Sequence, residues 1–159
     1  MLVEKASYFQ RITDSFRNSW LPRQALLQVA ALCYRLTDTG HEILLITSRG
    51  RGAWILPKGW PKSRLSSAET ALEEAFEEAG IRGRVIGTSI GQYHYTKSTS
   101  AGAMLECVAT VHEVALIEIA PDFPEKGERQ VQWFSPEAAA QAVTNSELAD
   151  ILLKFKPSV

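Results

Sequence analysis

Apolar residues follow two different spacings along this chain, and each spacing predicts one kind of element. Short, dense apolar runs bounded by turn residues predict β-strands at 25–34, 42–47, 54–56, 85–95, 104–114 and 130–134. Apolar residues at helical spacing predict helices over 68–79, from Ser135 onward and over 146–155, and more weakly over 4–17. Mixed strands with helices between and after them favour an α/β fold, a three-layer α/β/α sandwich around a mixed β-sheet.

The helix over 68–79 is defined most sharply. Its apolar positions form a single face, and Ser66 with Glu69 three residues later has the pattern of a capping box. Gly80 is suited to end the helix, because glycine adopts the left-handed conformation common just after a last turn. We therefore expect the helix to lie against the sheet.

The polar positions of this helix are unusual in charge. Five glutamates and no Lys or Arg lie between Ala68 and Gly80. Like charges four residues apart destabilise a helix by about 0.2–0.5 kcal/mol per pair. Two interpretations follow: a solvated acidic face, or a set of oxygen ligands for divalent cations, which would relieve the repulsion.

The residues before the helix favour the second interpretation. The run Trp54-Ile55-Leu56-Pro57-Lys58-Gly59-Trp60-Pro61 ends a short strand in a tight loop. With Gly59 as the opening glycine, residues 74–81 (Glu-Ala-Phe-Glu-Glu-Ala-Gly-Ile) follow in the register of the Nudix box. The chain thus resembles the Nudix hydrolase family, and its Leu-Pro-Lys-Gly segment resembles the branch acting on diphosphoinositol polyphosphates and dinucleoside polyphosphates. The resemblance implies a Nudix-type α/β/α sandwich.

Two positions depart from the family's box. Leu65 stands where the box has its first glutamate, and Glu73 stands where it has an arginine. In the family these two side chains commonly form an ion pair, so both partners are missing together. Lys62 and Arg64, just before the helix, are the candidates to replace the arginine.

The resemblance and the helix spacing together indicate where a metal would bind. Glu74 and Glu78 are one turn apart and can reach one ion, while Glu77 can bind a second ion or accept a proton from water. The family implies metal ligation by these three glutamates and by the carbonyl of Gly59, with Mg²⁺ or Mn²⁺ as the ion. Glu128 is a further metal-ligand candidate, because Nudix proteins often bring an extra acid from this side; the alternative is an ordinary loop glutamate.

Basic residues gather near the acidic helix although the net charge is only −1. We expect a small-molecule polyphosphate to bind the side chains of Arg49, Arg51, Lys58, Lys62 and Arg64. Nothing in the whole-chain charge predicts binding to a nucleic-acid polymer or a membrane. We expect one domain over 1–159, with a helical extension at 1–20, in the cytoplasm; monomer and homodimer both stay open.

The expected function is metal-dependent hydrolysis of a phosphoanhydride bond. Candidate substrates are a diphosphoinositol polyphosphate, a dinucleoside polyphosphate or a nucleoside diphosphate derivative. Glu74, Glu77 and Glu78 are the candidate catalytic residues. The alternative is a Nudix-fold ligand-binding or regulatory module with little or no catalysis, which the changes at Leu65 and Glu73 motivate.

Overall fold

The computed structural model describes residues 24–158, so the helical extension predicted at 1–20 lies outside the described residues. Its strands are β1 (Leu26–Thr37), β2 (Gly40–Thr47), β3 (Trp54–Ile55), β4 (Lys58–Gly59), β5 (Ile81–Ser98), β6 (Met104–Ile119) and β7 (Val131–Phe134). Its helices are α2 (Ser67–Ala79), α3 (Pro136–Ala142) and α4 (Ser146–Lys154). Within this part of the chain, no helix has the length and apolar character needed to cross a bilayer.

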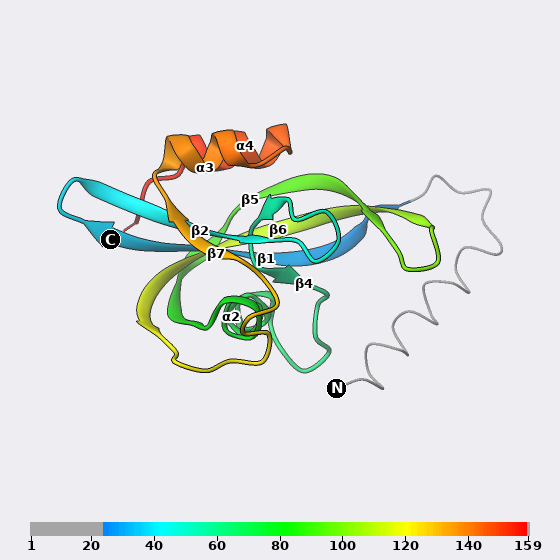
Figure 1. Ribbon diagram of the computed structural model, residues 1–159, viewed down its shortest axis with the longest axis horizontal. Coiled ribbons are helices and arrows are strands. Elements are labelled where there is room, and N and C mark those ends of the chain that lie inside the picture. Colours follow the sequence, from blue (N-terminus) through cyan, green and yellow to red (C-terminus); the bar gives the residue numbers. More distant parts are fainter. Residues whose placement is uncertain (1–23, 159) are drawn as a thin grey trace.

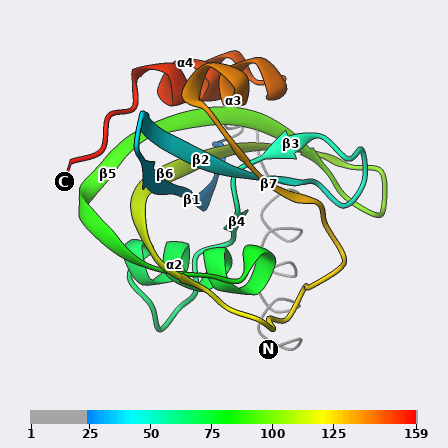
Figure 2. The same cartoon turned by 60° about the vertical axis from the view of Figure 1, so that its left-hand side comes forward.

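The strands form one mixed sheet. Five strands follow the order β3-β2-β1-β6-β5, with β4 paired to β1 and β7 paired to β2. Strand β1 runs parallel to β6 and antiparallel to β2 and β4. Helix α2 covers one face of the sheet while α3 and α4 cover the other (Figures 1 and 2). The α/β/α sandwich expected from the sequence is therefore confirmed.

The central strand β1 shows why both faces need a helix layer. Val29, Ala31 and Cys33 pack in the core beneath α2. The alternate residues Leu32 and Tyr34 pack in the core beneath α3 and α4. Successive side chains of a strand point to opposite faces, so the continuous apolar run 29–34 must be buried on both.

Most elements lie where the sequence predicts them, with two differences. Strands β5 and β6 extend beyond the predicted 85–95 and 104–114, because their hairpin continues pairing from Ile81–Ile119 to Ser98–Met104. Strand β4 lies in a stretch predicted as loop. It is only two residues long, pairing Gly59 with Val29 and Lys58 with Ala30, and a strand so short has no periodicity to detect.

Candidate active site

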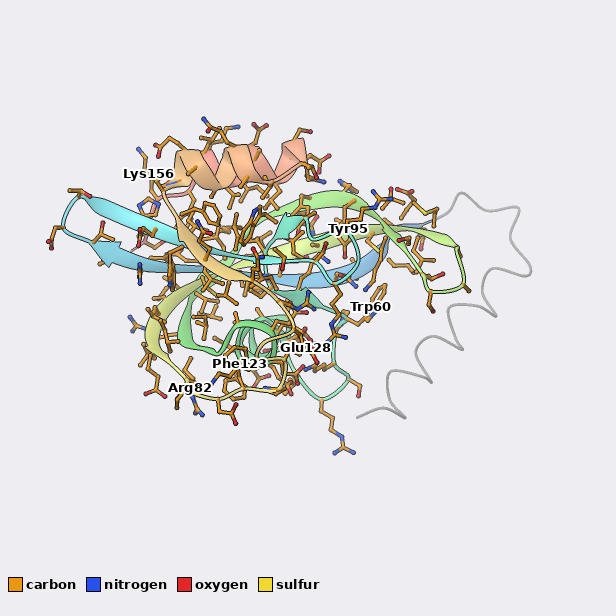
Figure 3. The ribbon with its side chains drawn as sticks, viewed as in Figure 1. Trp60, Arg82, Tyr95, Phe123, Glu128 and Lys156 are labelled. Atoms are coloured by element: carbon orange, nitrogen blue, oxygen red, sulfur yellow. The ribbon has the colours of Figure 1, made fainter. Side chains whose placement is uncertain are left out.

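Helix α2 is held at both ends as the sequence predicts. The Ser66 side chain accepts a hydrogen bond from the Glu69 amide, the Ser66 amide donates to the Glu69 carboxylate, and the helix ends at Gly80 with φ of 67°. A side chain at Gly80 would meet the ring of Phe123, which lies beside α2 (Figure 3). The capping fixes the register of the glutamates relative to the sheet.

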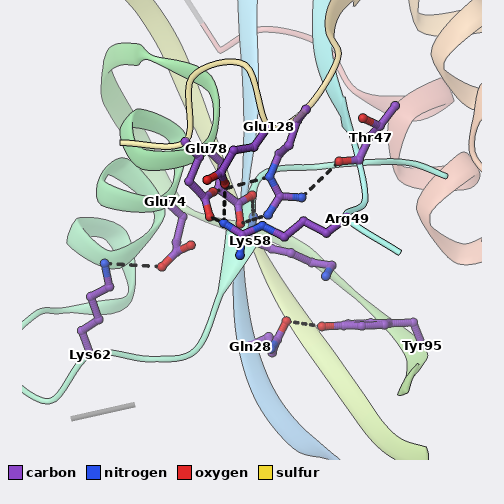
Figure 4. Close-up of polar contacts among 11 residues, drawn as sticks. Gln28, Thr47, Arg49, Lys58, Lys62, Glu74, Glu78, Tyr95 and Glu128 are labelled. Atoms are coloured by element: carbon purple, nitrogen blue, oxygen red, sulfur yellow. Dashed lines mark hydrogen bonds and ion pairs between the residues drawn. The ribbon is translucent and has the colours of Figure 1, made fainter. Parts of the chain in front are cut away.

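Two of the three predicted ligand glutamates are buried. Glu74 is 4% exposed and Glu78 is 8% exposed, so both carboxylates lie between α2 and the sheet edge (Figure 4). The backbone amide of Lys58 donates to Glu78 Oε2 at 3.2 Å. Burial raises the pKa of Glu78 to about 7, while the charge of Arg129 acts in the opposite direction.

A glycine is needed at position 59 because the Glu74 side chain approaches its backbone closely, and not because of a special backbone conformation. A Cβ at this position would collide with the Glu74 carboxyl group. Strand β4 fixes this approach, because Gly59 pairs with Val29 of the central strand. The Glu74 carboxylate therefore lies directly against the Gly59 backbone, the two groups that the family resemblance names as ligands.

The segment between β6 and β7 supplies a site residue that the sequence did not single out. The Glu125 amide donates to the Glu77 carbonyl at 3.0 Å and the Ala120 amide to the Gly80 carbonyl at 2.8 Å. These bonds bring Arg129 to the end of α2, where its guanidinium donates to Glu78 Oε1 at 3.1 Å and to the Thr47 carbonyl at 3.1 Å. The sequence signal was a charged residue shortly before β7.

The predicted substrate residue Lys62 instead faces the glutamates. Its ammonium lies 3.0 Å from Glu73 Oε2, 3.2 Å from Glu77 Oε1 and 3.4 Å from Glu74 Oε1. Burial lowers the pKa of Lys62, but its hydrogen bond to Glu73 and the charges of Glu74 and Glu77 outweigh that effect and raise the pKa. Lys62 thus places a cation beside Glu73, the residue that stands where the Nudix box has its arginine.

Glu128 lies farther out than the other candidate ligands. Its side chain is 50% exposed, and its carboxylate accepts from Arg49 at 2.7 Å. Arg49 also pairs with Glu125, which in turn lies 3.4 Å from Arg129 Nε. Metal ligation by Glu128 stays a prediction; Glu125 is linked to the buried Glu78 through their shared contact with Arg129.

A cleft of about 1520 Å³ opens beside these acids. Its walls include all five predicted substrate-binding residues, Arg49, Arg51, Lys58, Lys62 and Arg64. They also include Glu73, Glu74, Glu78 and Arg129. The cleft therefore combines a buried acidic wall with a basic rim. The rim is suited to bind an anionic ligand, and the carboxylates of the wall are suited to hold cations beside it.

Two lysines of the cleft make cation–π contacts with aromatic rings. Lys58 Nζ lies 4.5 Å from the centre of the Tyr95 ring, and Lys97 Nζ lies 5.1 Å from that of Trp60. Trp60 follows β4 and Tyr95 lies on β5 (Figure 3). Burial, with a smaller contribution from Lys97, lowers the pKa of Lys58 to about 8. The protonated form of Lys58 is suited to contact an anion.

The residues present fit a divalent cation in the chemistry of their donor atoms. Carboxylate and carbonyl oxygens are the ligands that Mg²⁺ and Mn²⁺ prefer. The space that a Cβ at Gly59 would fill is taken by the Glu74 carboxyl group. Among residues 24–158, no group of three or more His, Cys, Asp or Glu side chains is arranged to hold a metal ion. The Lys62 ammonium and the Arg129 guanidinium contact these carboxylates instead.

Comparisons with known proteins identify the family of this chain. Residues 26–155 match the model of the NUDIX domain. The Bos taurus diphosphoinositol polyphosphate phosphohydrolase 3-beta is 25% identical over 118 residues, which cover 73% of this chain and 68% of that protein.

Solved structures show the same fold. The C. elegans Ap4A hydrolase superposes with a TM-score of 0.61 at 17% identity, covering 83% of this chain and 96% of that one. The NUDIX domain of Shewanella oneidensis NrtR, solved with ADP ribose, superposes with a TM-score of 0.59 at 16% identity, covering 89% of this chain and 96% of that one.

The chain belongs to the Nudix family, since the domain match spans most of its length. It is distantly related to the diphosphoinositol polyphosphate phosphohydrolases.

Proposed function

We propose that this protein is a metal-dependent pyrophosphohydrolase that cleaves a phosphoanhydride bond in a small polyphosphorylated substrate. Candidate substrates are a diphosphoinositol polyphosphate, a dinucleoside polyphosphate or a nucleoside diphosphate derivative. One observation carries the proposal: two buried glutamates of α2, Glu74 and Glu78, form one wall of a cleft whose rim carries Arg51, Lys58 and Arg64.

The charge distribution supports this class of substrate. A diphosphate resists attack by water because its negative charge repels the nucleophile. The basic rim residues Arg51, Lys58 and Arg64 would bind and orient the phosphate groups. A divalent cation, when bound, neutralises phosphate charge and acidifies water. Glu74, Glu78 and the Gly59 carbonyl would hold it.

Glu77 and Arg129 each have a role that follows from their position. Glu77, whose side chain is 13% exposed, would share metal binding and accept the proton of the attacking water. Arg129 would orient Glu78, because it bonds to that carboxylate and to the fixed Thr47 carbonyl. Arg129 is therefore a positioning residue rather than a catalytic one.

The test is product formation from nucleotides, dinucleoside polyphosphates and diphosphoinositols with Mg²⁺, with Mn²⁺ and with chelator. We expect turnover that requires metal and falls at least about 100-fold in Glu78→Gln, because loss of a group that merely supports a metal ligand already costs about 10- to 100-fold. Glu69→Gln is the matched control: it lies on the same helix, its carboxylate serves the cap, and glutamine preserves that role. Near-normal turnover in Glu78→Gln would exclude the assignment.

A ligand-binding module without catalysis is the second candidate. It is favoured by the contacts of Lys62, whose ammonium occupies the side of Glu74 and Glu77 that a metal would otherwise use. The same assay separates the two functions. Folded protein that binds Mn²⁺ and a polyphosphate but releases no product with any substrate would support the module.

A further inference from the structure

Lys62 and Glu73 form an ion pair at the edge of the acidic wall. Glu73 stands at the box position of an arginine, and the cation that it contacts comes from the loop before α2 instead. Three carboxylates surround the Lys62 ammonium within 3.4 Å, those of Glu73, Glu74 and Glu77 (Figure 4 shows the contact with Glu74). The pair therefore lies in contact with two of the proposed metal ligands.

The three carboxylates differ in exposure. Side-chain exposure is 6% for Glu74, 13% for Glu77 and 36% for Glu73. The shortest of the three distances, 3.0 Å, is to the most exposed carboxylate, that of Glu73. Glu73 is not one of the proposed metal ligands. When a metal ion is bound by Glu74 and Glu77, Glu73 can therefore keep its ion pair with the Lys62 ammonium.

Like charges at such distances repel strongly. An ammonium and a divalent cation cannot share the same carboxylate oxygens, because their repulsion at a few ångströms stays large even at the effective dielectric of a protein surface. A metal ion that enters must therefore displace the Lys62 ammonium from Glu74 and Glu77. The lysine stem is flexible, so the ammonium can shift while it stays paired with Glu73.

We infer that Lys62 is the internal countercharge of the metal-free acidic wall, and that Glu73 is the acceptor that retains its ammonium when a divalent cation takes Glu74 and Glu77. The pair couples the loop 60–65 to metal binding. The inference rests on the proposed function only in so far as metal binds at these glutamates.

The test is a double-mutant cycle on Mn²⁺ affinity, measured by calorimetry on the full chain at pH 7. Lys62→Met removes the competing cation and is expected to tighten Mn²⁺ binding about tenfold. Glu73→Gln removes the acceptor, leaves the ammonium on Glu74 and Glu77, and is expected to weaken binding about tenfold. In the Lys62→Met background, Glu73→Gln is expected to change the affinity less than about twofold.

Two results would overturn the inference. Equal weakening by Glu73→Gln in both backgrounds would mean that Glu73 acts only through its long-range field. Weaker Mn²⁺ binding in Lys62→Met would mean that Lys62 supports the ligands instead of competing with the metal. Lys62→Gln repeats the measurement in case the methionine variant does not fold, and Arg64→Met removes a cation from the same loop as the matched control.

The cycle also separates this inference from the proposed function. Coupling between Lys62 and Glu73 without hydrolysis of any substrate would support the inference and exclude the hydrolase. Hydrolysis with metal binding but without coupling would exclude the inference alone. A folded wild-type chain that binds no Mn²⁺ would overturn both.

Discussion

The acidic wall contains two ion groups that differ in how firmly they are held. The Arg129 side chain is 8% exposed and contacts Glu78, Glu125 and the Thr47 carbonyl. The Lys62 side chain is 23% exposed, and within residues 24–158 it pairs with the carboxylates of Glu73, Glu74 and Glu77. A cation bonded to backbone is fixed by the fold, whereas one bonded only to side chains can exchange partners. We call the contacts of Arg129 around Glu78 the permanent half of the wall, and the contacts of Lys62 around Glu74 the exchangeable half.

Breaking the permanent half is expected to have the largest effect. Arg129→Met leaves the carboxylates of Glu78 and Glu125 without their shared cation, and removing one partner of a buried ion pair costs about 3–5 kcal/mol of unfolding free energy. Urea denaturation measures the loss. Arg49→Met is the matched control, because Arg49 contacts the same Glu125 but is 59% exposed, and an exposed pair contributes at most about 1 kcal/mol. Equal losses in the two variants would remove the distinction between the halves.

Displacing Glu74 tests the exchangeable half with a smaller expected effect. Gly59→Ala puts a methyl group where the Glu74 carboxyl group lies, and the flexible end of that side chain must move. We expect the fold to persist and Mn²⁺ affinity to fall about 10- to 100-fold, the range seen when the groups that position metal ligands are altered. Calorimetry provides the measurement. Gly50→Ala is the control, since a Cβ there meets nothing within 4 Å; unchanged affinity in Gly59→Ala would exclude the proposed ligand arrangement.

The hydrogen bond between His112 and Ser67 lies outside both ion groups, and we expect its loss to change the unfolding free energy least. His112 is 6% exposed, its Nε2 lies 2.7 Å from Ser67 Oγ in the first turn of α2, and burial lowers its pKa below the ordinary 6.5. As the pH falls below 6.5, the unfolded chain takes up a proton that folded His112 resists. This group's contribution to stability is therefore constant above that pH and declines below it.

The measurement is the unfolding free energy of wild type minus that of His112→Gln, followed from pH 8 to pH 5. Glutamine can bond to Ser67 but does not titrate in this window. We expect the difference to shrink as the pH falls. A difference that is flat or that grows toward pH 5 would contradict the lowered pKa.

Local patterns sufficed for the fold and for part of the site. Helix α2 could be placed from Ser66, Gly80 and the spacing of its apolar face, because caps and periodicity are set by neighbours in sequence. Arg129 could not be assigned, because its partner Glu78 is 51 residues away and is reached through a loop without periodicity. The sequence named Lys62 and Arg64 together as candidates to replace the box arginine, and it did not predict the contact of Lys62 with Glu73, because a charge pattern does not say which way a loop side chain turns.

The reversed Lys62–Glu73 pair changes how the box should be repaired by engineering. Compared position by position, the chain lacks an arginine at 73, and the obvious repair is to restore it. In terms of charge, however, the cation is already present at position 62, 3.0 Å from the carboxylate at 73. An arginine introduced at 73 alone would find no glutamate at 65 and would crowd a second cation against Glu74 and Glu77. Positions 62, 65 and 73 therefore form a single unit of design, to be changed together or left alone.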